Sequence, residues 1–338
     1  MQLSEAIDKK FVMIIDPNCF DYGDPSSYIS NFWREGLEIG VVAKNEAGKV
    51  TYKSFSVPKD PKFPEYFSTF VQIASEFSIP ISAVLHSFGD SFMGADPNYS
   101  VAKSGGQEYT QFVCPSQPPY WRYLATAARE IGRYPVSRLI VDEHFYPRLD
   151  FCMCRRCRVE FRRLSSVDLD VTVEDLIRDE DLLFRWVDWR SELLSSSLGE
   201  VADAFRSERP NTPVNMVIPV DPELDWLTGA TMHLGIDYEA LNESMDGVIF
   251  SIMPFSPVYP MTHTEPWLQL VARIAAIRKK LSKVKVSLMI GGLEGEWDVT
   301  WFQDLAKEVN AERMYGKMSF GSLFNIKREI HRGIDARF

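Results

Sequence analysis

The most informative stretch of the sequence is residues 139–146, which read LIVDEHFY. A short apolar run of this kind is typical of a parallel strand that is buried on both faces, and two carboxylates follow it directly. Adjacent side chains of a strand point to opposite faces, so we expect at most one of Asp142 and Glu143 to enter a site directly. On position alone, a solvated strand end is an equally good interpretation of the pair.

Similar apolar runs recur along the chain and predict eight strands. They are Phe11–Ile15, Ile39–Ala43, Ile81–Leu85, Ser137–Val141, Val214–Ile218, Gly247–Met253, Val284–Ile290 and Lys317–Leu323. Amphipathic, helix-length segments lie between most of them. We expect helices over Glu65–Phe77, Tyr120–Ile131, Leu182–Phe205, Trp267–Leu281 and Val299–Val309.

This alternation predicts an α/β fold, a (β/α)₈ TIM barrel with long loops after strands three and four. An open doubly wound sheet is the alternative. The Gly-rich phosphate fingerprint of that fold is missing after the first strand, where residues 16–19 read DPNC. No Gly/Ser-rich linker interrupts the 338 residues, so we expect a single barrel domain over residues 1–338.

The charge balance and the apolar pattern exclude several classes of protein. Lys and Arg number 37 against 47 Asp and Glu, and the net charge of -10 argues against a nucleic-acid partner. No apolar run approaches the roughly 18 residues of a membrane-spanning helix. The polar start of the chain carries no signal-peptide pattern, so we expect a cytoplasmic protein without a membrane partner. The sequence leaves a homo-oligomer open.

A cysteine-rich segment at about residues 110–160 predicts a metal site. Its C-x-C-x-x-C knuckle consists of Cys152, Cys154 and Cys157. A tetrahedral zinc ion needs a fourth ligand, for which Cys114 is the natural candidate, with Cys19, His144 or water as alternatives. Four thiolates would close the coordination shell and make the zinc structural. Ordinary buried cysteines are the competing interpretation, which the interleaved arginines disfavour.

Three segments together carry a resemblance to a known family. They are QFVCPSQPPY at residues 111–120, the strand ending in Asp142-Glu143, and CMCRRCRVEF at residues 152–161. In this order and spacing they resemble the catalytic barrel of the family 42 β-galactosidases among the glycoside hydrolases. The resemblance implies a retaining glycosidase with Glu143 as acid/base and zinc on the four cysteines. Asp142 stands where the family has Asn, and Thr110 and Gln111 stand where it commonly has arginines.

A retaining glycosidase needs a second carboxylate roughly 5–5.5 Å from the first. Residues 284–297 read VKVSLMIGGLEGEW, and Glu294 is our first choice of nucleophile, with Glu296 second. A Gly-rich turn with solvated glutamates is the competing interpretation. The substrate-binding candidates are Asp142, Asp16, His86 and Trp297.

The leading hypothesis is therefore a retaining hydrolase of a β-glycoside, for which a galactoside-like carbohydrate is a candidate substrate. We expect burial among aromatic rings, together with the neighbouring Asp142, to raise the pKa of Glu143 and keep it protonated. A non-catalytic carbohydrate-binding or structural barrel is the alternative. A metal-dependent hydrolase of another chemistry is disfavoured, because the five histidines are dispersed along the chain.

Overall fold

The computed structural model describes residues 11–17, 29, 38–103, 105–167, 170–220, 229–252, 265–293 and 300–318. Eight strands of this part close into a barrel in which every neighbouring pair is parallel. In barrel order they are β1 (Phe11–Ile15), β2 (Glu38–Lys44), β3 (Ile81–His86), β6 (Arg138–Asp142), β7 (Val214–Val220), β8 (Gly247–Ile252), β9 (Lys285–Leu293) and β10 (Met314–Met318). The predicted (β/α)₈ barrel is confirmed, and the open sheet is excluded.

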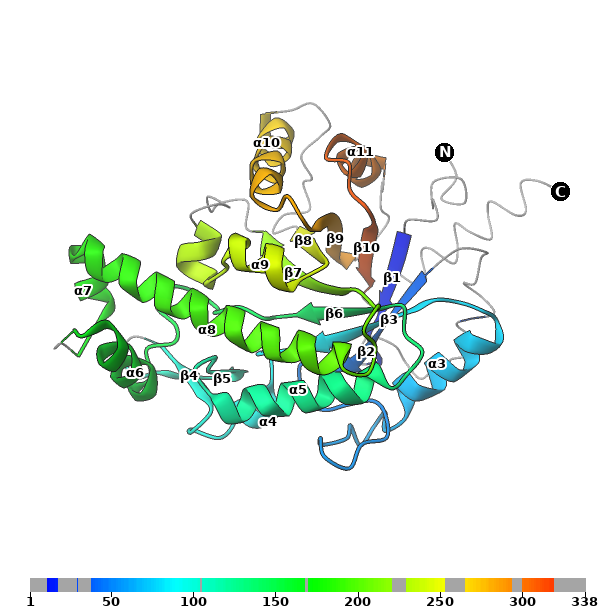
Figure 1. The fold of residues 1–338 in the computed structure, drawn as a ribbon, viewed down its shortest axis with the longest axis horizontal. Coiled ribbons are helices and arrows are strands. Elements are labelled where there is room, and N and C mark those ends of the chain that lie inside the picture. Colours follow the sequence, from blue (N-terminus) through cyan, green and yellow to red (C-terminus); the bar gives the residue numbers. More distant parts are fainter. Residues whose placement is uncertain are drawn as a thin grey trace.

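The helices that cover the barrel include the five amphipathic segments expected from the sequence and one further helix, α9 (Tyr238–Ser244), that the sequence analysis did not predict. The five expected helices are α3 (Tyr66–Glu76), α5 (Pro118–Gly132), α8 (Glu180–Arg206), α10 (Glu265–Lys280) and α11 (Thr300–Glu308). Figure 1 shows α5 and α8 lying side by side, with α10 and α11 on the opposite side of the barrel. None of the helices in the described ranges combines the length and the apolarity that crossing a membrane requires.

The two long connections expected after the third and fourth barrel strands contain structure of their own. The first holds the short helix α4 (Ser91–Gly94) and the antiparallel hairpin of β4 (Ser100–Ala102) and β5 (Glu108–Val113). The second holds α6 (Arg155–Ser165) and α7 (Val173–Arg178). Figure 1 shows the hairpin, α6 and α7 at one end of the molecule, the end toward which β6 points. These insertions therefore build up the rim at the carboxyl ends of the strands.

A compact apolar cluster fills the inside of the barrel. All eight strands contribute to it: Val12, Ile14, Val42, Val84, Ile140, Val217, Ile249, Met289 and Tyr315. Side chains two residues apart on a strand share a face. Asp16, His86 and Asp142 each follow a member of this cluster by two residues, so strand alternation directs them inward at the carboxyl end. That end carries the active site in barrels of this type.

Two strand boundaries differ by three residues from the sequence prediction. The last strand is β10, so the prediction of Lys317–Leu323 was wrong at its start, and residues 319–323 lie outside the described part. Pairing with β1 sets the position, because Phe11 and Ile14 align with Met314 and Lys317. The seventh strand, β9, runs on to Leu293 instead of ending at Ile290. The two glycines after Ile290 are therefore strand residues, and the competing interpretation of a Gly-rich turn is wrong for them.

Candidate active site

Glu143 follows directly after β6 with an unusual backbone. Its φ is 55°, in the left-handed region that residues other than glycine seldom adopt and that is over-represented at functional sites. Three hydrogen bonds fix this turn. The Glu143 N–H donates to Asp142 Oδ1 at 2.8 Å, and the Ser87 and Phe88 N–H groups donate to the carbonyls of Asp142 and Glu143 at 2.8 and 3.1 Å. The segment after β3 thus holds Glu143 in place.

The carboxylate of Glu143 lies against the ring of His86. Glu143 Oε2 is 3.1 Å from His86 Nδ1, and the two side chains are 21% and 0% exposed. His86 is the cross-strand partner of Asp142 in the β3–β6 register. The turn therefore brings the Glu143 carboxylate to His86 at the mouth. Strand alternation points Asp142 toward the same end, and the expectation that at most one carboxylate of the pair enters the mouth stays a prediction.

A glycine makes room for this carboxylate. A Cβ atom placed on Gly89 would lie 1.6 Å from Glu143 Oε2 and 2.6 Å from its Cδ. Real side chains do not approach so closely, so the observed position of Glu143 requires glycine at residue 89. Gly89 itself is held by a β-bridge to Phe112 at the end of the rim hairpin. The rim therefore positions the site as well as covering it.

A buried ion pair anchors the same segment. Lys44 Nζ lies 3.1 Å from Asp90 Oδ2, both side chains are fully buried, and the ammonium also donates to the His86 carbonyl at 2.9 Å. The Tyr120 hydroxyl donates to Asp90 Oδ2 at 2.7 Å. Burial, followed by the charge of Asp90, raises the pKa of Tyr120 well above its usual value, so the phenol stays a proton donor. The network ties β2, β3 and α5 together behind His86.

The remaining predicted site residues divide into two groups. Asp16 is buried after β1, at the same end of the barrel but two strands away from β3. Glu294, Glu296 and Trp297 lie outside the described residues. Their segment begins immediately after Leu293, at the carboxyl end of β9, and so starts from the same end of the barrel as Glu143.

The four predicted metal ligands come together beside the rim. The Sγ atoms of Cys114, Cys152, Cys154 and Cys157 all lie within 4.8 Å of one another. The Sγ atom of Cys114 lies 3.3 Å from that of Cys157 and 3.9 Å from that of Cys154. These distances are close to the ~3.8 Å edge of a tetrahedron with zinc–sulfur bonds of about 2.3 Å. Ser116 Oγ sits 3.0 and 3.1 Å from two of these sulfurs.

The electrostatics of this cluster suit a cation. Burial raises the pKa of the Cys114 and Cys157 thiols well above the usual value. Hydrogen bonds from the other three cysteines, that from Cys114 first, hold the pKa of Cys154 far below it. Without a cation, four thiolates in this space would repel one another, whereas a divalent ion deprotonates coordinating thiols. The donor set therefore fits a soft divalent metal such as zinc.

His144, an alternative fourth ligand, has another role. Its Nε2–H donates to the Leu194 carbonyl at 3.0 Å, and its Nδ1 accepts from the Ser87 hydroxyl at 2.7 Å. The ring is fully buried, and burial lowers its pKa to about 4. His144 is a neutral structural histidine that links β6 to α8. The other alternative, Cys19, lies outside the described residues.

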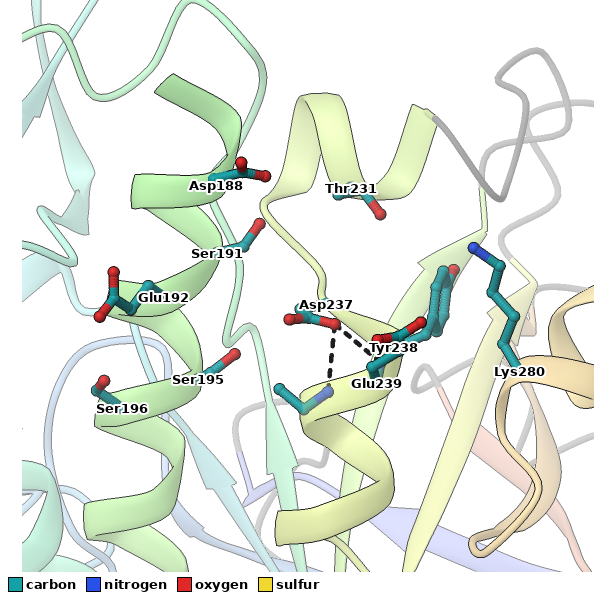
Figure 2. A pocket seen from close by; sticks show the side chains of 11 residues that line it. Asp188, Ser191, Glu192, Ser195, Ser196, Thr231, Asp237, Tyr238, Glu239 and Lys280 are labelled. Carbon is teal, nitrogen blue, oxygen red and sulfur yellow. Dashed lines mark hydrogen bonds between the residues drawn. The ribbon is translucent and has the colours of Figure 1, made fainter. Parts of the chain in front are cut away.

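A cavity of about 490 Å³ opens elsewhere, on the outside of the barrel wall. Figure 2 shows it between α8 and the segment of η2 (Ala230–Leu234) and α9, with Lys280 at its edge. Hydroxyls and carboxylates line it, among them Ser191, Asp188 and Asp237. No barrel strand contributes to its lining, so this cavity is separate from the mouth.

Two residues of the site, Glu46 and Gly89, were missed by the sequence analysis. Glu46, in the turn after β2, offers a carboxylate oxygen within 4.8 Å of the nearest ligand atoms of His86 and Glu143. Gly89 provides the space described above. Both matter only through residues 40 to almost 100 positions away, which no local pattern shows. An acid close after an apolar strand is the one hint that Glu46 gave.

The eight parallel strands and the helices between them define a (β/α)₈ barrel fold, and comparison with known structures agrees. No family model and no curated protein sequence matches the chain. The glycoside hydrolase domain of PgaB (BpsB) from Bordetella bronchiseptica is similar with a TM-score of 0.71 at 13% identity. The match covers 97% of this chain and 96% of that one.

Two β-galactosidases show the same likeness. The cold-adapted enzyme from Rahnella sp. R3 matches with a TM-score of 0.66 at 11% identity, over 96% of this chain and 54% of that one. A catalytic mutant of a GH42 β-galactosidase from G. stearothermophilus matches with a TM-score of 0.63 at 9% identity, over 92% and 51%. This chain thus spans about half the length of these enzymes. The expected likeness to the family 42 barrel is confirmed at the level of the fold.

Proposed function

We propose that this protein is a retaining glycoside hydrolase that cleaves a β-glycoside at the mouth of the barrel. The observation that carries the proposal is the position of Glu143. Its carboxylate is held at the carboxyl end of the fourth barrel strand, against buried His86 and partly open to solvent. Glycoside hydrolases with the same fold support the reaction class.

In the proposed reaction, Glu143 acts first as an acid and then as a base. Its proton passes to the glycosidic oxygen while the bond from that oxygen to the anomeric carbon breaks. A second carboxylate forms the new bond to the anomeric carbon. The ionised Glu143 then takes a proton from water, and this water releases the sugar from the covalent ester.

Glu294 is the first candidate for the second carboxylate, and Glu296 is the second. The extension of β9 to Leu293 favours Glu294, because it makes this residue the first one after the strand. A retaining mechanism requires a separation of roughly 5–5.5 Å between its carboxyl group and that of Glu143. Asp142, Asp16, His86 and Trp297 are the proposed contacts to the carbohydrate, and a galactoside is the first substrate to test.

We further propose one structural zinc ion on the cysteine cluster. Support comes from the mutual approach of the four sulfurs and from the backbone that they join. The Ala102 N–H of the rim hairpin donates to Cys152 Sγ at 3.4 Å, and the Met153 N–H donates to the Ala102 carbonyl at 2.8 Å. Zinc would therefore clamp the insertion after β3 to the one after β6. With four thiolates it keeps no position for substrate.

The proposed function is tested with aryl and alkyl β-glycosides of graded leaving-group acidity. Glu143→Gln should slow cleavage of alkyl glycosides by about 10²–10⁴-fold, because these need a proton on the leaving oxygen. Cleavage of aryl glycosides with acidic leaving groups should lose far less in its first step. Removal of the nucleophile, by Glu294→Gln or Glu296→Gln, should stop both kinds of substrate.

The matched control is Glu76→Gln, which makes the same chemical change at an exposed position on α3. It should leave all rates unchanged. Equal loss by Glu143→Gln on every leaving group, or no loss at all, would contradict the assignment of the acid. If the wild-type protein cleaves no member of a broad panel but binds its sugars, the non-catalytic carbohydrate-binding barrel replaces the enzyme.

A further inference from the structure

The mouth of the barrel contains a second group of side chains that suits a metal ion. We propose that Glu46, His86 and Glu143 form a divalent-cation site, separate from the cysteine cluster and open to ligands from solvent. One ligand atom from each residue lies within 4.8 Å of the other two. The three residues come from the ends of β2, β3 and β6, which are consecutive strands in the barrel.

The geometry is close to what a small cation needs. Nitrogen and oxygen ligands at about 2.0–2.2 Å from zinc lie about 3.4 Å apart in a tetrahedral shell, and up to roughly 4.4 Å in wider ones. His86 Nδ1 and Glu143 Oε2 are already 3.1 Å apart. Glu46 is exposed, so its side chain can close the remaining distance by rotating.

Two of the three ligands are held before any ion arrives. The His86 ring is fully buried on the inward face, and Gly89 keeps the Glu143 carboxylate beside it. The backbone of Glu46 is fixed as well, because its carbonyl accepts from the Ser91 N–H at 3.0 Å. Little conformational entropy is therefore lost when the ion binds, which favours affinity.

The charges at the mouth also favour a cation. The carboxylates of Glu46 and Glu143 are joined by that of Asp142, the cross-strand partner of His86. The nearby ammonium of Lys44 is in an ion pair with Asp90 at 3.1 Å and is fully buried. One imidazole and two carboxylates are ligands typical of zinc, cobalt and nickel, and three protein ligands leave positions open for water or substrate.

The consequence for activity rests on the proposed function. A metal ion bound to Glu143 stabilises its ionised form, whereas the acid step needs the protonated form, so the ion and the catalytic proton compete for this carboxyl group. Metal bound at the mouth should therefore inhibit glycoside cleavage. Because imidazole and carboxylate ligands must lose their protons to bind metal, affinity should fall as the pH is lowered.

The test uses full-length protein whose cysteine cluster is first loaded with one equivalent of Zn²⁺. Titration with Co²⁺, followed by calorimetry and by visible absorption, should show one further site. Its spectrum should be the weak one of nitrogen and oxygen ligation, without the thiolate charge-transfer band that displacement of zinc would produce. Glu46→Gln and His86→Asn should each weaken this site by at least about 10-fold, the loss typical of even indirect metal-site contacts. Glu76→Gln, on α3, should not.

Three results decide between a metal site and a simple hydrogen bond between His86 and Glu143. No second Co²⁺, or a second Co²⁺ unaffected by Glu46→Gln, overturns the site, and the pair of His86 and Glu143 is then a hydrogen bond alone. Glu46 is exposed, so this variant stays informative if His86→Asn misfolds. Binding with the expected spectrum and ligand dependence establishes the site. If such binding leaves glycoside cleavage at full rate, the site stands and Glu143 is not the acid.

Discussion

Gly89→Ala perturbs the candidate acid without touching its chemistry. The new Cβ would lie 1.6 Å from Glu143 Oε2, whereas carbon seldom approaches another heavy atom more closely than about 3.4 Å. The carboxylate oxygen must therefore move by roughly 1.8 Å, most simply by a rotation of the side chain. The φ of Gly89 does not lie in the left-handed region, so alanine can adopt the backbone there.

The expected effect is large on activity and small on stability. Misplacement of a reacting group by about 1 Å can cost on the order of 10²-fold in rate, so we expect kcat/KM for alkyl glycosides to fall by at least that factor. Aryl glycosides with acidic leaving groups should lose much less, because they do not depend on the proton from Glu143. Since the clash is with the end of a flexible side chain, Tm should change little.

The assay compares kcat/KM across a series of leaving groups for wild type, Gly89→Ala and a control, Gly199→Ala. A Cβ on Gly199 meets no atom within 4 Å, and this residue lies inside α8. The control should therefore keep full activity and gain about 0.5–1 kcal/mol of stability. If Gly89→Ala cleaves alkyl glycosides as fast as wild type, the observed position of Glu143 has no part in the reaction.

Three further predictions concern stability and metal content. His144 has a pKa of about 4 when folded against 6.5 when unfolded, so the unfolded chain binds more protons as the pH falls below 6.5. Urea titrations should therefore show about 2 kcal/mol less stability at pH 5 than at pH 7 from this residue, and a flatter pH dependence in His144→Gln. Asp90→Asn leaves the buried charge of Lys44 without its counter-ion, which should cost about 3–5 kcal/mol in the same titrations, and an unchanged midpoint would refute the ion pair. Cys154→Ser should lower the bound zinc, measured by elemental analysis, from one per chain to well below it and lower Tm, and full zinc content would show that this thiolate is not a ligand.

The fold was predictable because its signals are local. Each buried parallel strand needs its own apolar run, so alternation with amphipathic helices specified the barrel strand by strand. The last strand failed for a physical reason. Residues 317–323 read KMSFGSL and are a weak apolar signal, whereas the register with β1, a contact across the whole chain, places the strand at Met314–Met318. The end of β9 was predicted three residues too early because the apolar run stops at Ile290, whereas the strand continues through Gly291 and Gly292 to Leu293.

The candidate site was predictable in its parts and not in its assembly. The cysteine spacing identified the four candidate metal ligands, and the carboxylates at the strand end identified Glu143 as the candidate acid. The pairing of His86 with Glu143 depends on the β3–β6 register, which no local pattern encodes. The left-handed turn that brings Glu143 beside Asp142 breaks the alternation rule, and local rules are expected to fail at functional sites.

The most direct test of the retaining mechanism is to trap its covalent intermediate. Wild-type protein is incubated with a 2-deoxy-2-fluoro β-glycoside that carries an activated leaving group and matches a sugar the protein cleaves. Digestion and mass spectrometry then locate the labelled residue. The account predicts one sugar per chain, bound as an ester to the nucleophile, Glu294 or Glu296. This ester should hydrolyse only slowly, so that it accumulates. A label on another residue, or active protein that never becomes labelled, would contradict a retaining mechanism built on Glu143 and the segment after β9.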